Sequence, residues 1–119
     1  MNKQIDGSQE MIEYSPYRTL VVYEDIRRAR KWYNNFVEHY ADAIQRVRKG
    51  LNEMTIILKD DSIIDIVPFT DGIRGYRADC IYYDYKISEE GAWTYLSPRL
   101  THHNIYPFGK YYDEDTKDK

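Results

Sequence analysis

Asp84 is the residue whose type and place in the sequence best suit chemistry. It ends the apolar run from Cys80 to Tyr83, which has the pattern of a buried strand. A carboxylate at the carboxyl end of such a strand lies where open α/β sheets hold a metal or another ligand. Asp84 is therefore a candidate metal ligand, and the alternative is a residue kept for the fold. Asp79, near the start of the same strand, suits a hydrogen-bonding role.

Basic residues gather where a long helix is expected to begin. Its opening turns carry Arg27, Arg28, Arg30 and Lys31. The helix macrodipole disfavours a positive charge there by a few tenths to ~1 kcal/mol each. A chain tolerates that cost more readily if an anion such as nucleic acid or an acidic protein binds the cluster, and the alternative is a solvated helix face. Arg74, in a loop punctuated by two glycines, is a second candidate for phosphate contact or else a solvated loop residue.

Histidine and cysteine provide no further site. His102 and His103 are adjacent, so their side chains would diverge on a strand, and His39 stands alone in the long helix. These residues do not have the spacing of a zinc site. Cys80 lies in an apolar run, which suits a packed thiol better than a nucleophile.

The elements expected to position these residues alternate strand and helix, as in a βαβ unit. From Ile26 to Val47, apolar residues recur at a spacing of three and four, which predicts one helix of about 24 residues between an Asp25 cap and a Gly50 stop. The other expected elements are a strand at 18–23, a hairpin of 54–59 and 62–69, a strand at 76–85, a short helix capped by Ser88, and an edge segment at 104–108. The predicted fold class is α/β, a small and mostly parallel sheet with flanking helices and one antiparallel hairpin.

Length and composition indicate a single soluble domain. We expect a flexible lead-in at 1–16, one α/β domain at 17–109 and an acidic tail at 110–119. No apolar run reaches the ~20 residues of a membrane span, so no membrane partner is expected. The net charge of -3 gives no overall attraction to nucleic acid. One cysteine and an amino terminus unlike a signal peptide predict a cytoplasmic location, in a bacterium or an infected host cell.

Five features follow one another in a recognisable order. They are the strand and helix at 18–49, the hairpin at 55–64, the pair Arg74-Gly75, the apolar strand that ends in Asp84-Tyr85, and the segment 87–100 with its Trp93 and Pro98. In this order they resemble the middle of the ATPase domain of phage large terminases, the DNA-packaging motors of tailed bacteriophages. The likeness implies a partial P-loop-NTPase-like fold, in which the run ending at Asp84 is the Walker B strand and Asp84 takes the magnesium position.

The departures from the terminase pattern bear on activity. No G-x-x-x-x-G-K-S/T phosphate loop occurs in residues 1–119. Tyr85 stands where the family has the catalytic glutamate, and a tyrosine with a pKa near 10 cannot replace a carboxylate base. We therefore expect no catalytic residue, a vestigial Asp84, and no cofactor, unless another chain supplies a phosphate loop for Mg²⁺ and ATP.

Two functions are consistent with these features. The first is a terminase-like partial ATPase domain linked to DNA packaging, without independent ATP hydrolysis, and with a packaging protein or DNA as partner. The alternative is a small phage protein that binds and inhibits a host or phage protein, for example as an acidic decoy. Its support is the small size, the acidity and the 13 tyrosines, since tyrosine is enriched at interfaces.

Overall fold

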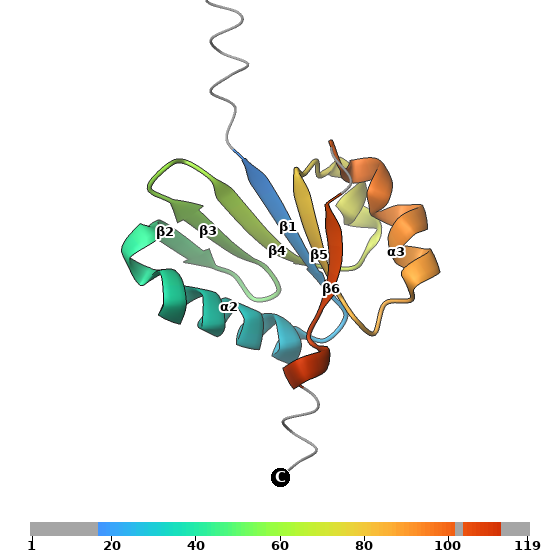
Figure 1. Cartoon of the computed structure of the whole chain (residues 1–119), viewed down its shortest axis with the longest axis horizontal. Helices are drawn as coiled ribbons and strands as arrows, with labels where there is room; N and C mark the ends of the chain where they lie inside the picture. The colour runs from blue at the N-terminus through green and yellow to red at the C-terminus, as the bar shows by residue number, and fades with distance from the viewer. Residues whose placement is uncertain (1–16, 102–103, 113–119) are drawn as a thin grey trace, which may run out of the picture.

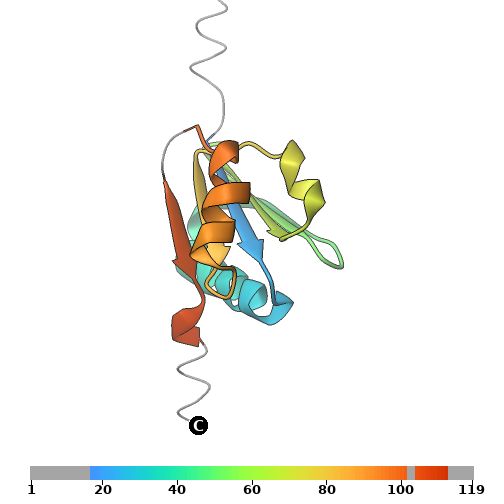
Figure 2. The same cartoon turned by 90° about the vertical axis from the view of Figure 1, so that its right-hand side faces the viewer.

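The described part of the computed structural model, residues 17–101 and 104–112, forms one twisted sheet with helices on both faces (Figure 1, Figure 2). The predicted lead-in at 1–16 and residues 113–119 of the predicted tail lie outside it. In chain order the elements are β1 (Arg18–Tyr23), α2 (Ile26–Tyr40), η1 (Ala41–Ala43), β2 (Ile44–Lys49), β3 (Met54–Leu58), β4 (Ile63–Pro68), η2 (Asp71–Gly75), β5 (Cys80–Asp84), α3 (Glu89–Tyr95), η3 (Ser97–Arg99) and β6 (Ile105–Phe108).

The six strands lie in the order β2-β3-β4-β1-β5-β6. Strand β1 pairs in parallel with β4 and β5, and β5 pairs in parallel with β6. Strands β3 and β4 form the predicted antiparallel hairpin. The expected fold class, a mostly parallel α/β sheet with an antiparallel hairpin, is confirmed.

The prediction of one long helix was wrong in its second half, because α2 ends at Tyr40 and residues 44–49 form β2, an edge strand antiparallel to β3. A register shift between Ile44 and Arg46 explains the misleading spacing. A bulge adds one residue to a strand, so Ile44 and Val47, three apart, project from the same face. They stand opposite Leu58 and Ile56 there, and their spacing imitates that of a helix.

The two faces of the sheet carry separate cores. Helix α2 packs Ala29 and Tyr33 against the face that presents Val21, Ile56 and Ile66. The other face is covered by the segment from η2 to η3, with α3 at its centre. Its core residues are Leu20, Val22, Val67, Ile73, Ala78, Ile81, Tyr83, Ile87, Ala92 and Leu96. Strand β1 contributes to both cores, which makes it the centre of the fold.

Local sequence signals explain the shorter elements. Ser88 caps α3 by accepting a hydrogen bond from the Gly91 N–H at 2.9 Å, as predicted. In the turn between β3 and β4, Asp61 adopts a positive φ of 72°, a conformation that aspartate tolerates better than most residues. No helix in the described residues is long and apolar enough to cross a membrane.

Candidate functional site

Asp84 lies at the carboxyl end of β5, beside the carboxyl end of the parallel strand β1. The chain leaves β1 at Tyr23 and enters α2 at Ile26, so the amino terminus of α2 lies at the same edge. The Asp84 side chain is 0% exposed. A buried carboxylate is costly unless it is paired and hydrogen-bonded, so its partners decide what it can do.

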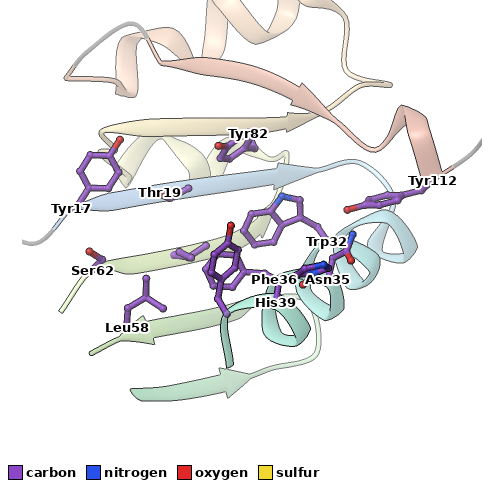
Figure 3. A pocket seen from close by; sticks show the side chains of 12 residues that line it. Tyr17, Thr19, Trp32, Asn35, Phe36, His39, Leu58, Ser62, Tyr82 and Tyr112 are labelled. Atoms are coloured by element: carbon purple, nitrogen blue, oxygen red, sulfur yellow. Dashed lines mark hydrogen bonds between the residues drawn. The ribbon is translucent and has the colours of Figure 1, made fainter. Parts of the chain in front are cut away.

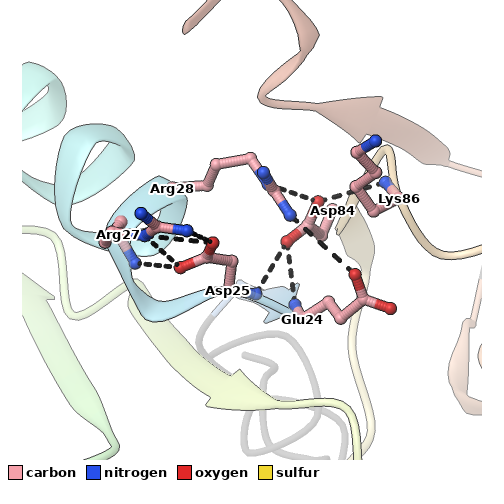
Figure 4. Close-up of polar contacts among 6 residues, drawn as sticks. All are labelled: Glu24, Asp25, Arg27, Arg28, Asp84 and Lys86. Carbon is pink, nitrogen blue, oxygen red and sulfur yellow. Dashed lines mark hydrogen bonds and ion pairs between the residues drawn. The ribbon is translucent and has the colours of Figure 1, made fainter. Parts of the chain in front are cut away.

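Four donors surround the Asp84 carboxylate, two on each oxygen (Figure 4). Oδ1 accepts from Arg28 Nε at 2.8 Å and from the Lys86 N–H at 3.1 Å. Oδ2 accepts from the N–H groups of Glu24 at 2.8 Å and Asp25 at 3.1 Å. An ionised carboxylate offers about four lone-pair sites, so these donors fill its acceptor capacity.

Arg28 supplies the cation that balances Asp84. Its side chain is only 10% exposed, and its second acidic neighbour is Glu24, 3.9 Å away. The Tyr85 ring centroid lies 5.3 Å from the guanidinium carbon. Gly109, with φ +99°, packs against the aliphatic part of the Arg28 side chain. A Cβ at this position would lie 2.9 Å from Arg28 Cδ. The ion pair is thereby enclosed by residues that follow β5 and β6.

Asp25 caps α2 and pairs with Arg27. Its Oδ1 accepts from the Arg27 N–H at 2.9 Å, and its Oδ2 lies 2.6 Å from Arg27 Nη2. The side-chain hydrogen bonds from Arg27, and then its backbone N–H, lower the pKa of Asp25 from 3.8 to about 2. The cap is therefore ionised at neutral pH, which also suits the positive end of the helix dipole.

The Asp84 surroundings do not fit a magnesium ion. Mg²⁺ requires a nearly octahedral set of oxygens at roughly 2.0–2.1 Å, whereas the neighbours of Asp84 are N–H donors and a guanidinium. In residues 17–101 and 104–112, no three His, Cys, Asp or Glu side chains form a group that could hold a metal ion. These contacts fit a residue kept for the fold, and the role of Asp84 stays a prediction.

The cations predicted to bind an external anion are separated by the structure. Arg28 turns inward to Asp84, while Arg27 extends outward and pairs with Asp25. Both cations at the amino end of α2 thus face carboxylates of the same chain, which offsets the unfavourable helix dipole.

The other predicted anion-binding residues are Arg30, Lys31 and Arg74. Arg30 and Lys31 are exposed on α2, and the Lys31 ammonium lies 6.0 Å from the Tyr112 ring centroid. Arg74 belongs to η2, and its side chain is outside what the structure describes. Anion binding by these residues stays a prediction.

Asp79 and Cys80 behave as the sequence predicts. The Asp79 carboxylate accepts hydrogen bonds from the Arg18 N–H at 2.9 Å and from Thr101 Oγ1 at 2.7 Å, which ties β1 to the segment after η3. Burial raises the pKa of the Cys80 thiol, which makes it less reactive.

The histidines remain minor features. Nδ1 of His39 lies 2.8 Å from the Asn35 carbonyl oxygen, one helical turn away. This contact uses one ring nitrogen within α2 itself. The predictions for His102 and His103 fall outside the described residues.

An aromatic groove of about 530 Å³ lies between α2 and the sheet face beneath it (Figure 3). The Trp32 and Phe36 rings stack along its α2 wall with centroids 5.3 Å apart, and Tyr82 lies 6.1 Å from Trp32. We define the aromatic groove by its lining residues, Tyr17, Thr19, Trp32, Asn35, Phe36, His39, Tyr40, Leu58, Ser62, Ile64, Tyr82 and Tyr112. Sequence reasoning missed this surface, for which the high tyrosine content was the available signal.

The lining of the aromatic groove is aromatic and uncharged. Among the described residues, its lining contains no Asp, Glu, Lys or Arg. Burial raises the pKa of Tyr17 and Tyr82, so their hydroxyls stay neutral. The groove therefore offers ring surface and neutral hydrogen-bonding groups.

Comparison with known proteins shows a likeness of fold. The structure is similar to the large terminase from the thermophilic bacteriophage D6E, with a TM-score of 0.52 and 13% identity over 83% of this chain. It is likewise similar to the same terminase in complex with ATP-gamma-S, with a TM-score of 0.51 and 14% identity over 84% of this chain. The chain spans about a quarter of those terminases, 27% and 26% of their lengths. No family model and no curated protein matches the sequence.

Proposed function

We propose that this chain is a terminase-like domain that takes part in phage DNA packaging and does not hydrolyse ATP on its own. The support for a packaging role is the likeness of its fold to a large terminase, together with the order of sequence features that led to the same family. On this proposal it acts in the cytoplasm of an infected cell, with a packaging protein or DNA as its partner.

The hydrogen bonds and the ion pair of Asp84 are the observation that argues against ATP hydrolysis. In the resemblance to terminases, Asp84 takes the magnesium position. Its two oxygens accept four hydrogen bonds, and its charge is balanced by Arg28 at 2.8 Å. A magnesium ion would have to displace a buried guanidinium and leave backbone N–H groups without acceptors, each at a cost of about 1–3 kcal/mol.

Tyr85 supports the same conclusion. Hydrolysis needs a group that orients and deprotonates water, and a neutral phenol is a poor base at pH 7. The ring of Tyr85 lies over the Arg28 guanidinium, 5.3 Å from centroid to Cζ. Tyr85 thus contributes to the enclosure of the ion pair instead of providing a carboxylate.

Phosphate release from Mg²⁺-ATP tests the lack of hydrolysis. In a malachite-green assay, we expect the wild-type chain to release no more phosphate than its Asp84→Asn variant. The matched control is Asp42→Asn, because Asp42 is an exposed acidic residue in η1. Magnesium-dependent turnover that Asp84→Asn abolishes and Asp42→Asn retains would overturn the proposal.

The packaging role is tested by purified components. Direct binding of the chain to portal protein, small terminase or DNA from the same phage is the expected result. The ATPase assay repeated with the neighbouring gene product would detect a phosphate loop supplied by another chain. If none of the packaging components binds, the packaging role is wrong even where the fold likeness holds.

The alternative function is a small phage protein that occupies a host or phage protein. The aromatic groove favours it, because Tyr and Trp are enriched at the energetic centres of protein interfaces. Stoichiometric capture of a host nuclease, polymerase accessory or defence factor, with no binding to packaging components, would support this alternative over the terminase-like role.

A further inference from the structure

We propose that the outer edge of β2 binds one extended segment of a partner protein as an added strand, and that acidic and apolar side chains alternate in this segment. The edge is remote from the Asp84 cluster, because β3, β4 and β1 lie between β2 and β5. The inference does not depend on either proposed function. It rests on the outward backbone groups of β2, on its charges and on the difference between its two faces.

Within the part of the chain that the structure describes, β2 is an edge strand with no neighbour on its outer side (Figure 1). The Gly50 N–H donates to the Glu53 carbonyl oxygen at 2.7 Å, which makes these two residues a hydrogen-bonded pair. In antiparallel strands such pairs alternate with pairs whose N–H and C=O groups point away from each other. Lys49 and Val47 fall in the second kind of pair, so their backbone groups point outward from the sheet.

The opposite edge of the sheet is less suited to strand addition. Strand β6 is only 4 residues long and contains Pro107, which has no N–H to offer to an added strand. Strand β2 has 6 residues and no proline. The comparison selects β2 as the edge that can pair with a further strand.

The charged side chains of β2 are all positive. Arg46, Arg48 and Lys49 are exposed, and the strand contains no acidic residue. On the face that carries the two arginines, Asp65 lies two strands inward, where its carboxylate accepts a hydrogen bond from Thr55 Oγ1 at 3.0 Å. An added strand would therefore run beside cations, which an acidic segment complements.

The ends of β2 carry mixed charge and do not select a partner. Asp42 precedes the strand in η1, and Glu53 follows it in the turn to β3. Lys59, whose backbone N–H bonds to η1, is followed by Asp60 and Asp61. The choice of an acidic segment rests on the three cations within the strand itself.

The two faces of β2 differ, which predicts the order of side chains in the partner segment. Val47 stands opposite Ile56 of the core beneath α2 and is 39% exposed. Lys49 lies on the same face, with its ammonium 4.9 Å from the Tyr33 ring centroid. The two arginines project from the other face. Because successive side chains of a strand alternate between faces, the fitting segment has acidic residues on the arginine face and apolar residues beside Val47.

Two other occupants fit this edge less well. A second copy of the chain, paired through its own β2, would bring arginines beside arginines, and like charges that face each other destabilise a sheet. A nucleic acid provides phosphate acceptors for the N–H groups but no row of donors for the outward C=O groups, whereas a peptide strand supplies both. Cations also protect an edge strand from unwanted pairing, but this protection acts against neutral and basic strands and not against acidic ones.

The test uses the isotope-labelled full chain and a synthetic peptide in which Glu and Val alternate. One control peptide has Lys in place of every Glu, and another has the same composition with Val and Glu in separate blocks. NMR titration measures binding. Amide hydrogen exchange of Val47 and Lys49 reports whether the peptide is added as a strand.

Two changes in β2 separate the backbone from the charges. Val47→Pro removes one outward N–H, a substitution that edge strands accommodate, and the double variant Arg46→Glu, Arg48→Glu reverses the charge. Its matched control is the double variant Arg77→Glu, Lys110→Glu, because both residues are exposed cations outside β2. Circular dichroism checks folding, and if Val47→Pro does not fold, the charge reversal decides alone.

We expect the alternating Glu and Val peptide to slow exchange of the two outward amides at least about 10-fold. It should bind at least about 10-fold more weakly to the charge-reversed β2, a loss of about 1.4 kcal/mol, while the Lys and Val peptide gains binding there. Val47→Pro should also weaken binding, and the matched control should bind like wild type.

The inference would be overturned if the alternating peptide did not bind, if it left the exchange of these amides unchanged, or if the block peptide protected them equally well. Protection of the same amides by oligo-dT instead of the peptide would identify a nucleic-acid site, and protection that grows with protein concentration alone would identify self-pairing. Either result would also contradict an acidic strand as the occupant.

Discussion

The Asp84 cluster and the aromatic groove border the same helix, α2. They differ in how completely their side chains are paired with other residues or covered by them. Around Asp84, four donors and one cation complete the needs of a buried charge. In the aromatic groove, large rings such as those of Tyr17 and Tyr40 remain about half exposed. The first region resembles a catalytic site in sequence but is closed by its own chain. The second carries no motif, and several of its rings remain exposed.

This difference shows that a residue's position in a fold does not by itself assign its chemistry. Asp84 lies where an α/β sheet commonly binds ligands, but Arg28 reaches it from α2 and pairs with it at 2.8 Å. Because the cluster joins β1, α2 and β5, we expect its loss to affect stability strongly. Substitutions at the rim of the groove should leave stability almost unchanged.

Asp84→Ala should give the largest effect. It would leave the Arg28 guanidinium and three backbone N–H groups without their acceptor, so we expect the free energy of unfolding to fall by about 3–5 kcal/mol. Urea denaturation followed by circular dichroism measures this change. Asp42→Ala, an exposed residue of η1, should stay within about 0.5 kcal/mol of wild type. A similar small loss for Asp84→Ala would contradict the role of the cluster.

Gly109→Ala should give the second largest loss of free energy of unfolding. An alanine there would be strained at a φ of +99° and would approach Arg28 Cδ to 2.9 Å, so a loss of about 1–3 kcal/mol is expected. Gly75→Ala is the matched control, because a Cβ there meets nothing within 4 Å and its φ is not in the positive range. Equal unfolding midpoints for the two variants would show that the enclosure of Arg28 is loose.

Asp25→Ala should cost about 1 kcal/mol through the lost helix cap, with a distinct pH dependence. The folded pKa of Asp25, about 2, lies below its ordinary value of 3.8, so its ionic contribution is present above pH 4 and is lost as the pH falls towards 2. The stability difference between wild type and variant should shrink over that interval. Ser88→Ala removes the uncharged cap of α3, and its effect should not change in this way.

The smallest effects are expected in the aromatic groove. Tyr40→Ser and Tyr95→Ser remove rings of equal exposure, 55%, and each should change the free energy of unfolding by no more than about 0.5 kcal/mol. Thermal unfolding of the two variants measures this. A loss of several kcal/mol for Tyr40→Ser alone would mean that the groove is part of the core and is not an open surface.

Much of the fold could be predicted from local sequence, since β1, the β3–β4 hairpin, the Ser88 cap and the edge strand β6 follow from periodicity, turn residues and capping. The end of α2 could not, because the bulge in β2 gives Ile44 and Val47 the spacing of a helical face. Only pairing with β3 decides whether residues 44–49 form a strand or continue the helix, and that pairing is a tertiary interaction.

The candidate site was predictable in its position but not in its state. Asp84 was identified from its place at the end of an apolar run. Its partner Arg28 lies 56 residues earlier, and the signal for that pairing was a cation placed against the helix dipole. Gly109, which backs Arg28, and the aromatic groove depend on contacts between distant segments, so no local pattern indicates them.

The most direct measurement of whether Asp84 is committed to Arg28 is a double-mutant cycle of Arg28→Met and Asp84→Asn, followed by urea unfolding. If the two side chains form this buried pair, their coupling free energy should exceed about 1 kcal/mol, because each single variant leaves the other side chain buried without its partner. Additive effects, within about 0.5 kcal/mol, would contradict the pairing and return Asp84 to consideration as a metal ligand.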